Sequence, residues 1–335
     1  MATTIKDIAR ICNVSPSTVS KVIKNYPNIP EETKKRVWDV IEKYHYVPNY
    51  AASSLSSGDY RNIGILGFLN DKESPLSRHL FSLILASFQK EMNLNGYNLV
   101  FIDKRSSGRT SFLKDCEYKM VAGVLMFGNL YDEQMQEVMD SSIPCVGFDY
   151  EGEKINSVHT KGEKALYDLT SYIISHGHKD IIFISGDQNH MTDNRIKGFK
   201  KAMLEHNLPL YDYSVLSIPY GSINDSEVMT EKIINEHPNV TAIIYPDDLT
   251  ALVGFHKLKL LNKRVPEDIS IAGFDGTIFS EYISPALTTM KQDVGGIGKS
   301  LARLLIDQIR YPSLPIRKIA YDAVLFKGET ISSRD

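Results

Sequence analysis

The chain has 335 residues, of which 42% are hydrophobic and 24% are charged. This length exceeds what one hydrophobic core usually supports, so we expect two or three domains. The 38 basic and 41 acidic residues give a formal charge of -3, which argues against a chain that coats nucleic acid along its whole length but leaves room for a local basic domain.

The sequence shows no sign of membrane insertion or secretion. No apolar stretch approaches the roughly 18 residues of a transmembrane helix, and the first residues lack the apolar segment of a signal peptide. The three cysteines, Cys12, Cys116 and Cys145, lie far apart, which fits neither a disulfide framework nor a zinc ribbon. We therefore expect a cytoplasmic protein whose thiols belong to its core.

The first 57 residues differ in composition from the rest. They hold eight basic and five acidic residues and no glycine. Three helical patterns follow one another: the first begins after the N-cap residue Thr4, the second takes Ser15 as its cap and Pro16 as its first residue, and the third runs from about Pro30 to Tyr44. Three short helices around so small a core predict a helix-turn-helix.

The outward face of the second helix is unusual. It carries short hydroxyl side chains and one cation, namely Ser15, Ser17, Thr18, Ser20 and Lys21. A solvated helix face ordinarily carries long charged side chains, whereas short hydroxyls let a backbone approach DNA and bond phosphates or base edges. Composition alone leaves DNA contact and a plain exposed helix as open alternatives.

A serine-rich linker follows, and strands then alternate with helices. Candidate strands are Ile63–Phe68, Asn98–Ile102, Val121–Phe127, Cys145–Phe148, Ile181–Ser185, Ala242–Tyr245 and Ile269–Phe274. Amphipathic helical stretches include Phe81–Leu94, Lys161–Ser175, Arg195–Glu205 and Thr250–Leu260. This alternation predicts an α/β fold with parallel sheets covered on both faces, and its length favours two lobes over one.

Several segments together resemble the lactose-repressor (LacI/GalR) family. Thr4–Ala9, Val14–Ile23 and Tyr46–Asn49 resemble its headpiece. Later segments match in the same order: Gly177-His178, Arg195, Gly198-Phe199, Val265–Ser270, Gly273–Asp275, and Pro285–Thr289 with Gln292. The resemblance covers almost the whole chain, and it settles the open alternatives for the second helix in favour of DNA contact.

The resemblance implies a domain plan. A helix-turn-helix headpiece occupies residues 1–47 and a hinge helix residues 48–58. Two doubly wound α/β lobes of the periplasmic-binding-protein type then follow, the first from residues 61–160 with 290–318 and the second from residues 161–289 with 319–335. The family further implies a homodimer on a near-palindromic operator, with a small effector between the lobes that alters DNA affinity.

The resemblance also assigns DNA contacts. They fall on the headpiece and hinge: Thr4, Ser15, Pro16, Ser17, Thr18, Ser20, Lys21, Asn28, Tyr46, Asn49, Ala52, Ser53 and Leu55. Pro16 offers only apolar contact, such as with a thymine methyl, and Lys21 can bind guanine without the fork of an arginine. Leu55 matches the apolar wedge that kinks DNA at the minor groove, whereas Ser53 stands where relatives often have arginine.

A cleft site is predicted at the carboxyl ends of strands, where open parallel sheets bind ligands. Asp149 and Asp275 each close a candidate strand, Asp248 follows another, and Arg195 follows the loop after Ile181–Ser185. Paired oxygens and a guanidinium suit sugar hydroxyls. The resemblance supports Arg195 and Asp275 and adds Phe81, Tyr220, Asp247 and Gln292, with Tyr220 as a stacking aromatic. Thr160-Lys161 departs from the acidic-Asn pair frequent in relatives.

Other motifs fail on inspection. The segment Gly295–Ser300 lacks the first glycine of a phosphate loop, which is Asp293 here, and we assign it to a helix through Ile309. His176-Gly177-His178 is too short a spacing for a metal site. No nucleophile and base present themselves, so we expect neither an enzyme nor a cofactor.

The sequence favours a repressor controlled by a sugar-like effector over three other functions. A global regulator gated by a phosphoprotein partner is the main alternative. A sugar-binding receptor without DNA function is opposed by the basic first 57 residues, and a doubly wound enzyme by the missing phosphate loop. No leucine heptads follow the expected last strand near Tyr321–Phe326, so a dimer is favoured over a tetramer.

Overall fold

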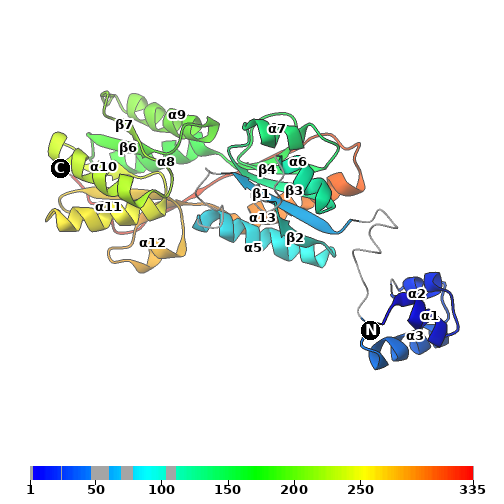
Figure 1. Cartoon of the computed structure of the whole chain (residues 1–335). Coiled ribbons are helices and arrows are strands. Elements are labelled where there is room, and N and C mark those ends of the chain that lie inside the picture. The colour runs from blue at the N-terminus through cyan, green and yellow to red at the C-terminus, as the bar shows by residue number, and fades with distance from the viewer. Residues whose placement is uncertain (1–2, 24, 47–59, 69–77, 103–110, 335) are drawn as a thin grey trace. The chain divides into compact units, whose positions relative to one another are not determined.

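The change in composition after residue 57 coincides with a division of the molecule. The computed structural model describes residues 3–23, 25–46, 60–68, 78–102 and 111–334, and the chain forms two units, Met1–Tyr60 and Arg61–Asp335. Figure 1 shows the helices and strands of each unit.

The first unit contains the three predicted helices, α1 (Ile5–Ile11), α2 (Pro16–Ile23) and α3 (Glu31–Lys43). Local side-chain bonds begin two of them. Thr4 caps α1 in a capping box, because its hydroxyl accepts from the Asp7 N–H while the Asp7 carboxylate accepts from the Thr4 N–H. The Ser15 hydroxyl accepts from the Thr18 N–H at 3.1 Å and so caps α2.

The core of this unit is small and apolar. Its buried residues are Ile8, Ala9, Cys12, Val19, Val22, Val37 and Ile41. They come from all three helices at helical spacing, so each helix buries one stripe and leaves the rest of its surface to solvent. The fold class predicted for this segment is confirmed.

The second unit is built on two six-stranded sheets. The first has the order β11-β5-β4-β3-β1-β2 and the second the order β12-β10-β9-β8-β6-β7. The first is made of β1 (Asn62–Phe68), β2 (Asn98–Phe101), β3 (Val121–Gly128), β4 (Cys145–Phe148), β5 (Asn156–Thr160) and β11 (Lys318–Tyr321). The second is made of β6 (Ile181–Ser185), β7 (Val215–Ser217), β8 (Ala242–Ile244), β9 (Ser270–Asp275), β10 (Thr288–Lys291) and β12 (Val324–Phe326). Neighbouring strands are parallel except β10 and β12, which are antiparallel.

Helices cover both faces of the first sheet, and together with it form what we call the first lobe. On one face α5 (His79–Leu94) and α13 (Val294–Arg310) pack against Leu125 and Phe127. On the other face α6 (Phe112–Tyr118) and α7 (Glu133–Met139) pack against Val124 and Met126. Alternate residues of β3 therefore serve opposite faces, as a strand buried on both sides requires.

The second lobe repeats this plan around the second sheet. One face packs against α8 (Gly162–Ser175) and α9 (His190–Glu205), and the other against α10 (Ile223–Glu236) and α11 (Asp248–Leu260). A short helix, α12 (Ile278–Tyr282), follows β9. The predicted arrangement of two parallel sheets with helices on both faces is confirmed.

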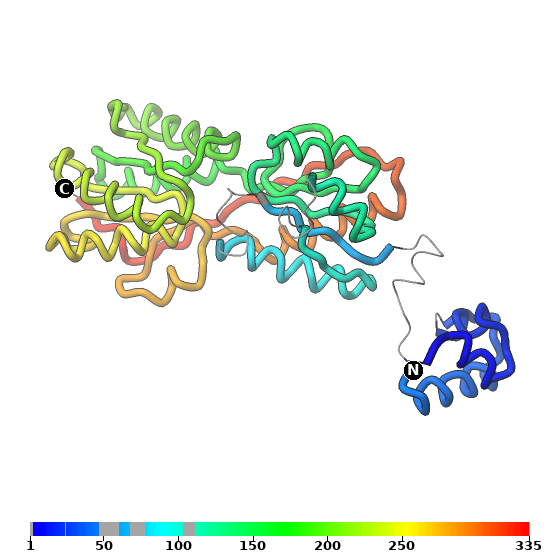
Figure 2. Tube along the Cα trace, in the orientation of Figure 1, coloured from blue at the N-terminus to red at the C-terminus, as the bar shows by residue number. Residues whose placement is uncertain are grey.

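The chain passes between the lobes three times, after β5, after β10 and after β11. The sequence predicts one last strand near Tyr321–Phe326, but two short strands stand there, β11 in the first sheet and β12 in the second. The passages consequently lie at residues 160–162, 291–294 and 321–324, which places β10 in the second lobe and β11 in the first, unlike the expected boundaries at 289/290 and 318/319. In Figure 2 the orange-to-red end of the chain accordingly runs through both lobes.

The three cysteines are all free and buried, as predicted for core thiols. Burial raises the pKa of Cys116 to about 12 and also raises that of Cys145. These thiols stay protonated and unreactive at neutral pH.

Candidate functional site

The outward face of α2 is exposed and polar. Ser15, Pro16, Ser17 and Lys21 are exposed, and Thr18 and Ser20 are partly so. The Ser15 hydroxyl lies 2.7 Å from that of Ser17 and 2.9 Å from that of Thr18. The hydroxyls thus form one local cluster on a well-packed helix, which is a pre-organised surface for phosphates or base edges.

The other predicted DNA contacts differ in setting. Asn28 is exposed, whereas Tyr46 packs against the core of the first unit. Thr4 is exposed, but its hydroxyl also donates to Asp7 at 2.7 Å. The hinge positions Asn49, Ala52, Ser53 and Leu55 lie outside the described residues.

In the second unit a chain of polar contacts joins the ends of four strands, β4, β5, β9 and β10. The Thr160 hydroxyl donates to the Gln292 side-chain oxygen, and Gln292 Nε2 donates to Asp275 Oδ1 at 2.8 Å. The Thr160 N–H donates to Asp149 Oδ1 at 3.3 Å. Since Thr160 and Gln292 lie at two of the passages between lobes, this chain brings the predicted Asp149, Asp275 and Gln292 together between the lobes.

Both aspartates of this chain have perturbed ionisation. Burial raises the pKa of Asp149 to about 7, against the opposing effect of Arg195. Burial also raises the pKa of Asp275 well above its ordinary value, again opposed by Arg195. Their backbones are left-handed, with φ of 55° and 108°, a conformation that aspartate tolerates better than most residues.

Arg195 on α9 lies beside these carboxyls and is almost fully buried, with 3% of its surface exposed. Its guanidinium lies 3.6 Å from the ring centroid of Phe274, and Nη1 donates to the Pro246 carbonyl at 2.9 Å. Its Nε is buried and has no hydrogen-bond partner within the described part of the chain. Arg195 is therefore held in place by its own lobe while keeping one donor for a ligand.

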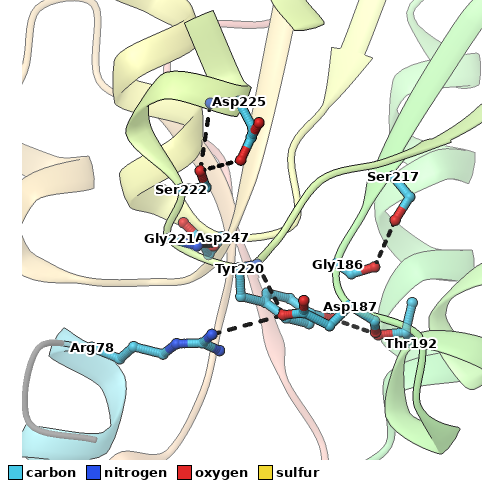
Figure 3. A network of polar contacts seen from close by, with 10 residues as sticks. All are labelled: Arg78, Gly186, Asp187, Thr192, Ser217, Tyr220, Gly221, Ser222, Asp225 and Asp247. Atoms are coloured by element: carbon cyan, nitrogen blue, oxygen red, sulfur yellow. Dashed lines mark hydrogen bonds and ion pairs between the residues drawn. The ribbon is translucent and has the colours of Figure 1, made fainter. Parts of the chain in front are cut away.

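Tyr220 forms the aromatic part of the site. Its ring is buried, and its hydroxyl lies 3.0 Å from that of Thr192. The guanidinium carbons of Arg195 and of Arg78 each lie 5.6 Å from the Tyr220 ring centroid. Figure 3 shows Arg78 reaching from the first lobe toward Tyr220 and Asp187 of the second.

Phe81 lies on the side of the first lobe. Its ring centroid is 5.2 Å from that of Phe127 and 6.1 Å from that of Phe148, two residues near the carboxyl ends of β3 and β4. The Arg78 guanidinium lies 6.0 Å from the Phe81 ring. The structure thus connects Phe81 to the rest of the site through Arg78.

Asp247 and Asp248 are engaged by their own lobe. Asp247 caps α11 and accepts from the Gly221 N–H at 2.8 Å. Asp248 accepts from the N–H and hydroxyl of Thr277 at 2.6 and 2.9 Å and from the Thr289 hydroxyl at 2.6 Å. Burial raises the Asp248 pKa to about 7. These two carboxyls support the strand ends, in contrast to Asp149 and Asp275.

A cavity of about 370 Å³ adjoins this site between the lobes, and its wall includes Thr160. Glu151 of the first lobe, also on this wall, accepts from Asn194 of α9 at 2.8 Å and lies 2.9 Å from Nδ1 of His190. These contacts and the Arg78–Asp187 ion pair join the two lobes.

Sequence reasoning did not single out Arg78, Thr192 or Asp187. Arg78 is the N-cap residue of α5, yet it makes no side-chain cap bond. A cation at the start of a helix is electrostatically unfavourable, and this is the one signal in the sequence that could have marked it.

No group of histidines, cysteines and carboxylates suited to a metal ion occurs among the described residues. His178, weighed as a possible ligand, is fully buried and bonds to Thr241 and Ser332. Burial lowers its pKa to about 4, so it stays neutral. Within the described ranges no helix is long and apolar enough to cross a membrane.

Two family models match the chain. Residues 4–49 match "bacterial regulatory proteins, lacI family", and residues 170–331 match "periplasmic binding protein-like domain". Catabolite control protein A of Priestia megaterium is 31% identical over 312 residues, which cover 91% of this chain and 92% of that protein. The HTH-type transcriptional repressor PurR of Aliivibrio fischeri is 29% identical over 315 residues, covering 92% of each.

Solved structures agree on the fold. The lac repressor dimer bound to operator and the anti-inducer ONPF has a TM-score of 0.84 at 22% identity, covering 99% of this chain and 100% of that one. The complex of the transcriptional regulator CelR with cellobiose has a TM-score of 0.72 at 21% identity, covering 98% and 99%. On these matches and the helix-turn-helix described above, the chain belongs to the lacI family of bacterial regulatory proteins and is a DNA-binding transcriptional regulator.

Proposed function

We propose that the chain is a repressor that binds operator DNA through the α2 face. A small sugar-like effector that binds between the lobes changes its affinity for the operator. The observation that carries the proposal is the polar chain from Asp149 through Thr160 and Gln292 to Asp275. It runs through two of the passages between lobes, so a ligand that bonds to it contacts the parts of the chain that must change when the lobes move.

The coupling follows from linkage. An effector that binds one arrangement of the lobes more tightly shifts the population toward that arrangement. The contacts of Glu151 with Asn194 and of Arg78 with Asp187 belong to the arrangement seen here. An effector must therefore preserve or break these contacts, and operator affinity changes with them.

The DNA side of the proposal assigns roles to single residues. Lys21 donates to guanine, Pro16 contacts a thymine methyl, and the hydroxyls of Ser15, Ser17 and Thr18 bond to phosphates or base edges. The hydroxyl cluster supports this assignment, because it holds three short polar side chains together at the start of α2.

The proposed active form is a homodimer, which acts at the chromosome in the bacterial cytoplasm. An apolar surface on the second lobe supports a second copy as the partner: Ile278, Phe279 and Tyr282 of α12 are 56%, 52% and 81% exposed, and Leu249 of α11 is 46% exposed. Exposed apolar groups clustered in this way are typical of protein interfaces. The dimer of the lac repressor structure has the same fold.

Deletion of residues 1–57 tests whether the first unit alone carries DNA binding. DNA duplexes enriched from a random pool by the full chain serve as operator, and binding is measured by fluorescence anisotropy. We expect a chain without residues 1–57 to lose specific binding while keeping the thermal transition of the second unit. Specific binding by the shortened chain contradicts the proposal.

Substitution in the cleft tests the effector side. A panel of sugars and sugar phosphates is first tested for a member that changes the operator affinity of the full chain. Arg195→Ala and Asp275→Asn are expected to keep operator binding and to lose the response to that member. A normal response in both variants contradicts the placement of the effector. Asp212→Asn, an exposed aspartate of the same lobe, is the matched control.

A further inference from the structure

Two arginines from different lobes approach the same aromatic ring with unused donors. Arg78 of the first lobe and Arg195 of the second lie on the Tyr220 ring at equal distances of 5.6 Å. Each has a buried Nε atom without a hydrogen-bond partner among the residues described. A buried donor left unpaired costs free energy, so two at one site indicate an acceptor that the chain itself does not supply.

Asp187, the ion-pair partner of Arg78, forms no hydrogen bond with its guanidinium group. Its terminal nitrogen lies 3.7 Å from Asp187 Oδ2, which is an ion pair but longer than a hydrogen bond. The same oxygen accepts from the Tyr220 N–H at 3.2 Å, and the Asp187 side chain is 51% exposed. A guanidinium binds carboxylate or phosphate through paired bonds at about 2.7–2.9 Å, and Arg78 forms no such pair with Asp187.

The nearby carboxyl groups do not take up these donors. Asp149 and Asp275 lie near Arg195, but their oxygens accept from Thr160 and Gln292, and burial raises the pKa of both. Asp187 pairs with Arg78 only at 3.7 Å and is half exposed. An acidic group on a ligand supplies the closer acceptor that Arg78 lacks, which a neutral ligand does not.

We infer that the effector is a sugar-like ring bearing an acidic group, carboxylate or phosphate, which Arg78 binds while the ring lies on Tyr220. This inference rests on the proposed function, because it takes the effector to bind between the lobes. It makes Arg78, a residue outside the predicted site, the determinant of effector class. Carboxylate and phosphate share the geometry that the arginine fork recognises, so experiment distinguishes them.

Matched ligands test the class. The full chain is titrated calorimetrically with glucose, glucuronate and glucose 6-phosphate, and with the corresponding members of the galactose and mannose series. We expect an acidic member to bind at least about 10-fold more tightly than its neutral counterpart, and the comparison of uronate with phosphate identifies the group. Equal binding of neutral and acidic members, or binding of no acidic member, overturns the inference.

Paired substitutions test the residue. Arg78→Gln should lower the affinity for the acidic ligand by about 10- to 100-fold and abolish the preference for it over the neutral ligand. Arg78→Lys should restore part of this preference. Asp187→Asn should raise the affinity for the acidic ligand, because it removes a carboxylate that competes for Arg78. The amide oxygen of the new side chain can still accept from the Tyr220 N–H. If Arg78 merely fastens the lobes through Asp187, both variants weaken binding alike, which overturns the inference.

Operator binding, measured in parallel, separates this inference from the proposed function. A neutral sugar that controls operator affinity equally in the full chain and in Arg78→Gln refutes the acidic effector and leaves the regulator intact. An acidic ligand that binds through Arg78 without changing operator affinity supports the assignment of Arg78 and refutes effector control.

Discussion

The two units organise their polar groups over different distances along the chain. In the first unit the bonds that shape the functional surface join residues three positions apart or fewer, such as Thr4 with Asp7 and Ser15 with Thr18. In the second unit the corresponding bonds join residues as far apart as Thr160 and Gln292, which are separated by 132 positions. The DNA surface is thus a local product of one helix, whereas the cleft exists only when both lobes are folded.

This difference predicts how substitutions separate binding from stability. Changes on the α2 face should affect DNA affinity with little effect on folding, because the side chains are exposed. Changes among the strand-end carboxyls should affect folding as well as the response to the effector, because these groups accept hydrogen bonds within the second unit. Four substitutions test the contrast.

The largest effect is expected for Asp248→Ala. It leaves three donors, from Thr277 and Thr289, without their acceptor, which should destabilise the second unit by about 3 kcal/mol. Urea unfolding measures the loss, and Asp212→Ala, an exposed site of the same lobe, should change stability by less than about 0.5 kcal/mol. A loss for Asp248→Ala no greater than for the control contradicts its supporting role.

Lys21→Ala should reduce specific operator affinity by about 2 kcal/mol, roughly 30-fold, and relax preference at one base pair. The melting temperature of the first unit should not change, since Lys21 is exposed. Anisotropy with single-base operator variants measures both effects. Lys201→Ala, on the second unit, controls for the loss of one positive charge.

The raised pKa of Asp149 predicts a pH-dependent difference between wild type and Asp149→Asn. Because the folded pKa of about 7 exceeds the ordinary value of 3.8, the stability that this carboxyl contributes is present below pH 3.8 and is lost as pH rises through 7. Wild type should therefore become steadily less stable relative to the variant as the pH rises from 4 to 7. Thermal unfolding across this range measures it, and a difference that does not vary with pH contradicts the expectation.

The smallest effect is expected for Thr4→Ala, which removes the capping box of α1 and should destabilise the first unit by about 1 kcal/mol. Thr4→Ser should retain most of this stability. Circular dichroism of the full chain during unfolding follows the transition of the first unit, and an equal loss in both variants excludes the cap as the cause.

Much of the fold followed from local patterns. The caps Thr4 and Ser15, the start of α2 at Pro16 and the buried strands β4 and β6 all have short-range signals that the structure reproduces. The candidate strands read from the sequence do not include β5, β7 and β10, and they contain one strand where the structure has β11 and β12. These strands are three to five residues long, and a pattern so short carries no information about which sheet it joins.

The candidate site was predictable in part. The sequence predicts that residues at the carboxyl ends of strands gather, and in the structure Asp149, Arg195, Tyr220, Asp275 and Gln292 lie near one another. The distinction between these carboxyls and Asp248 was beyond sequence reasoning, because it depends on threonines that arrive from other strands. Arg78 was missed because its role depends on Tyr220, which belongs to the other lobe.

By itself, the sequence determined the helix-turn-helix, the parallel α/β lobes and the hydroxyl-rich face of α2, since each depends on residue spacing within one element. Tertiary structure alone decided which strand-end carboxyls are engaged by their own lobe and which face Arg195, and where the chain passes between the lobes. The physical reason is that hydrogen bonding and burial of a side chain depend on neighbours in space, and in the second unit those neighbours lie far away along the chain.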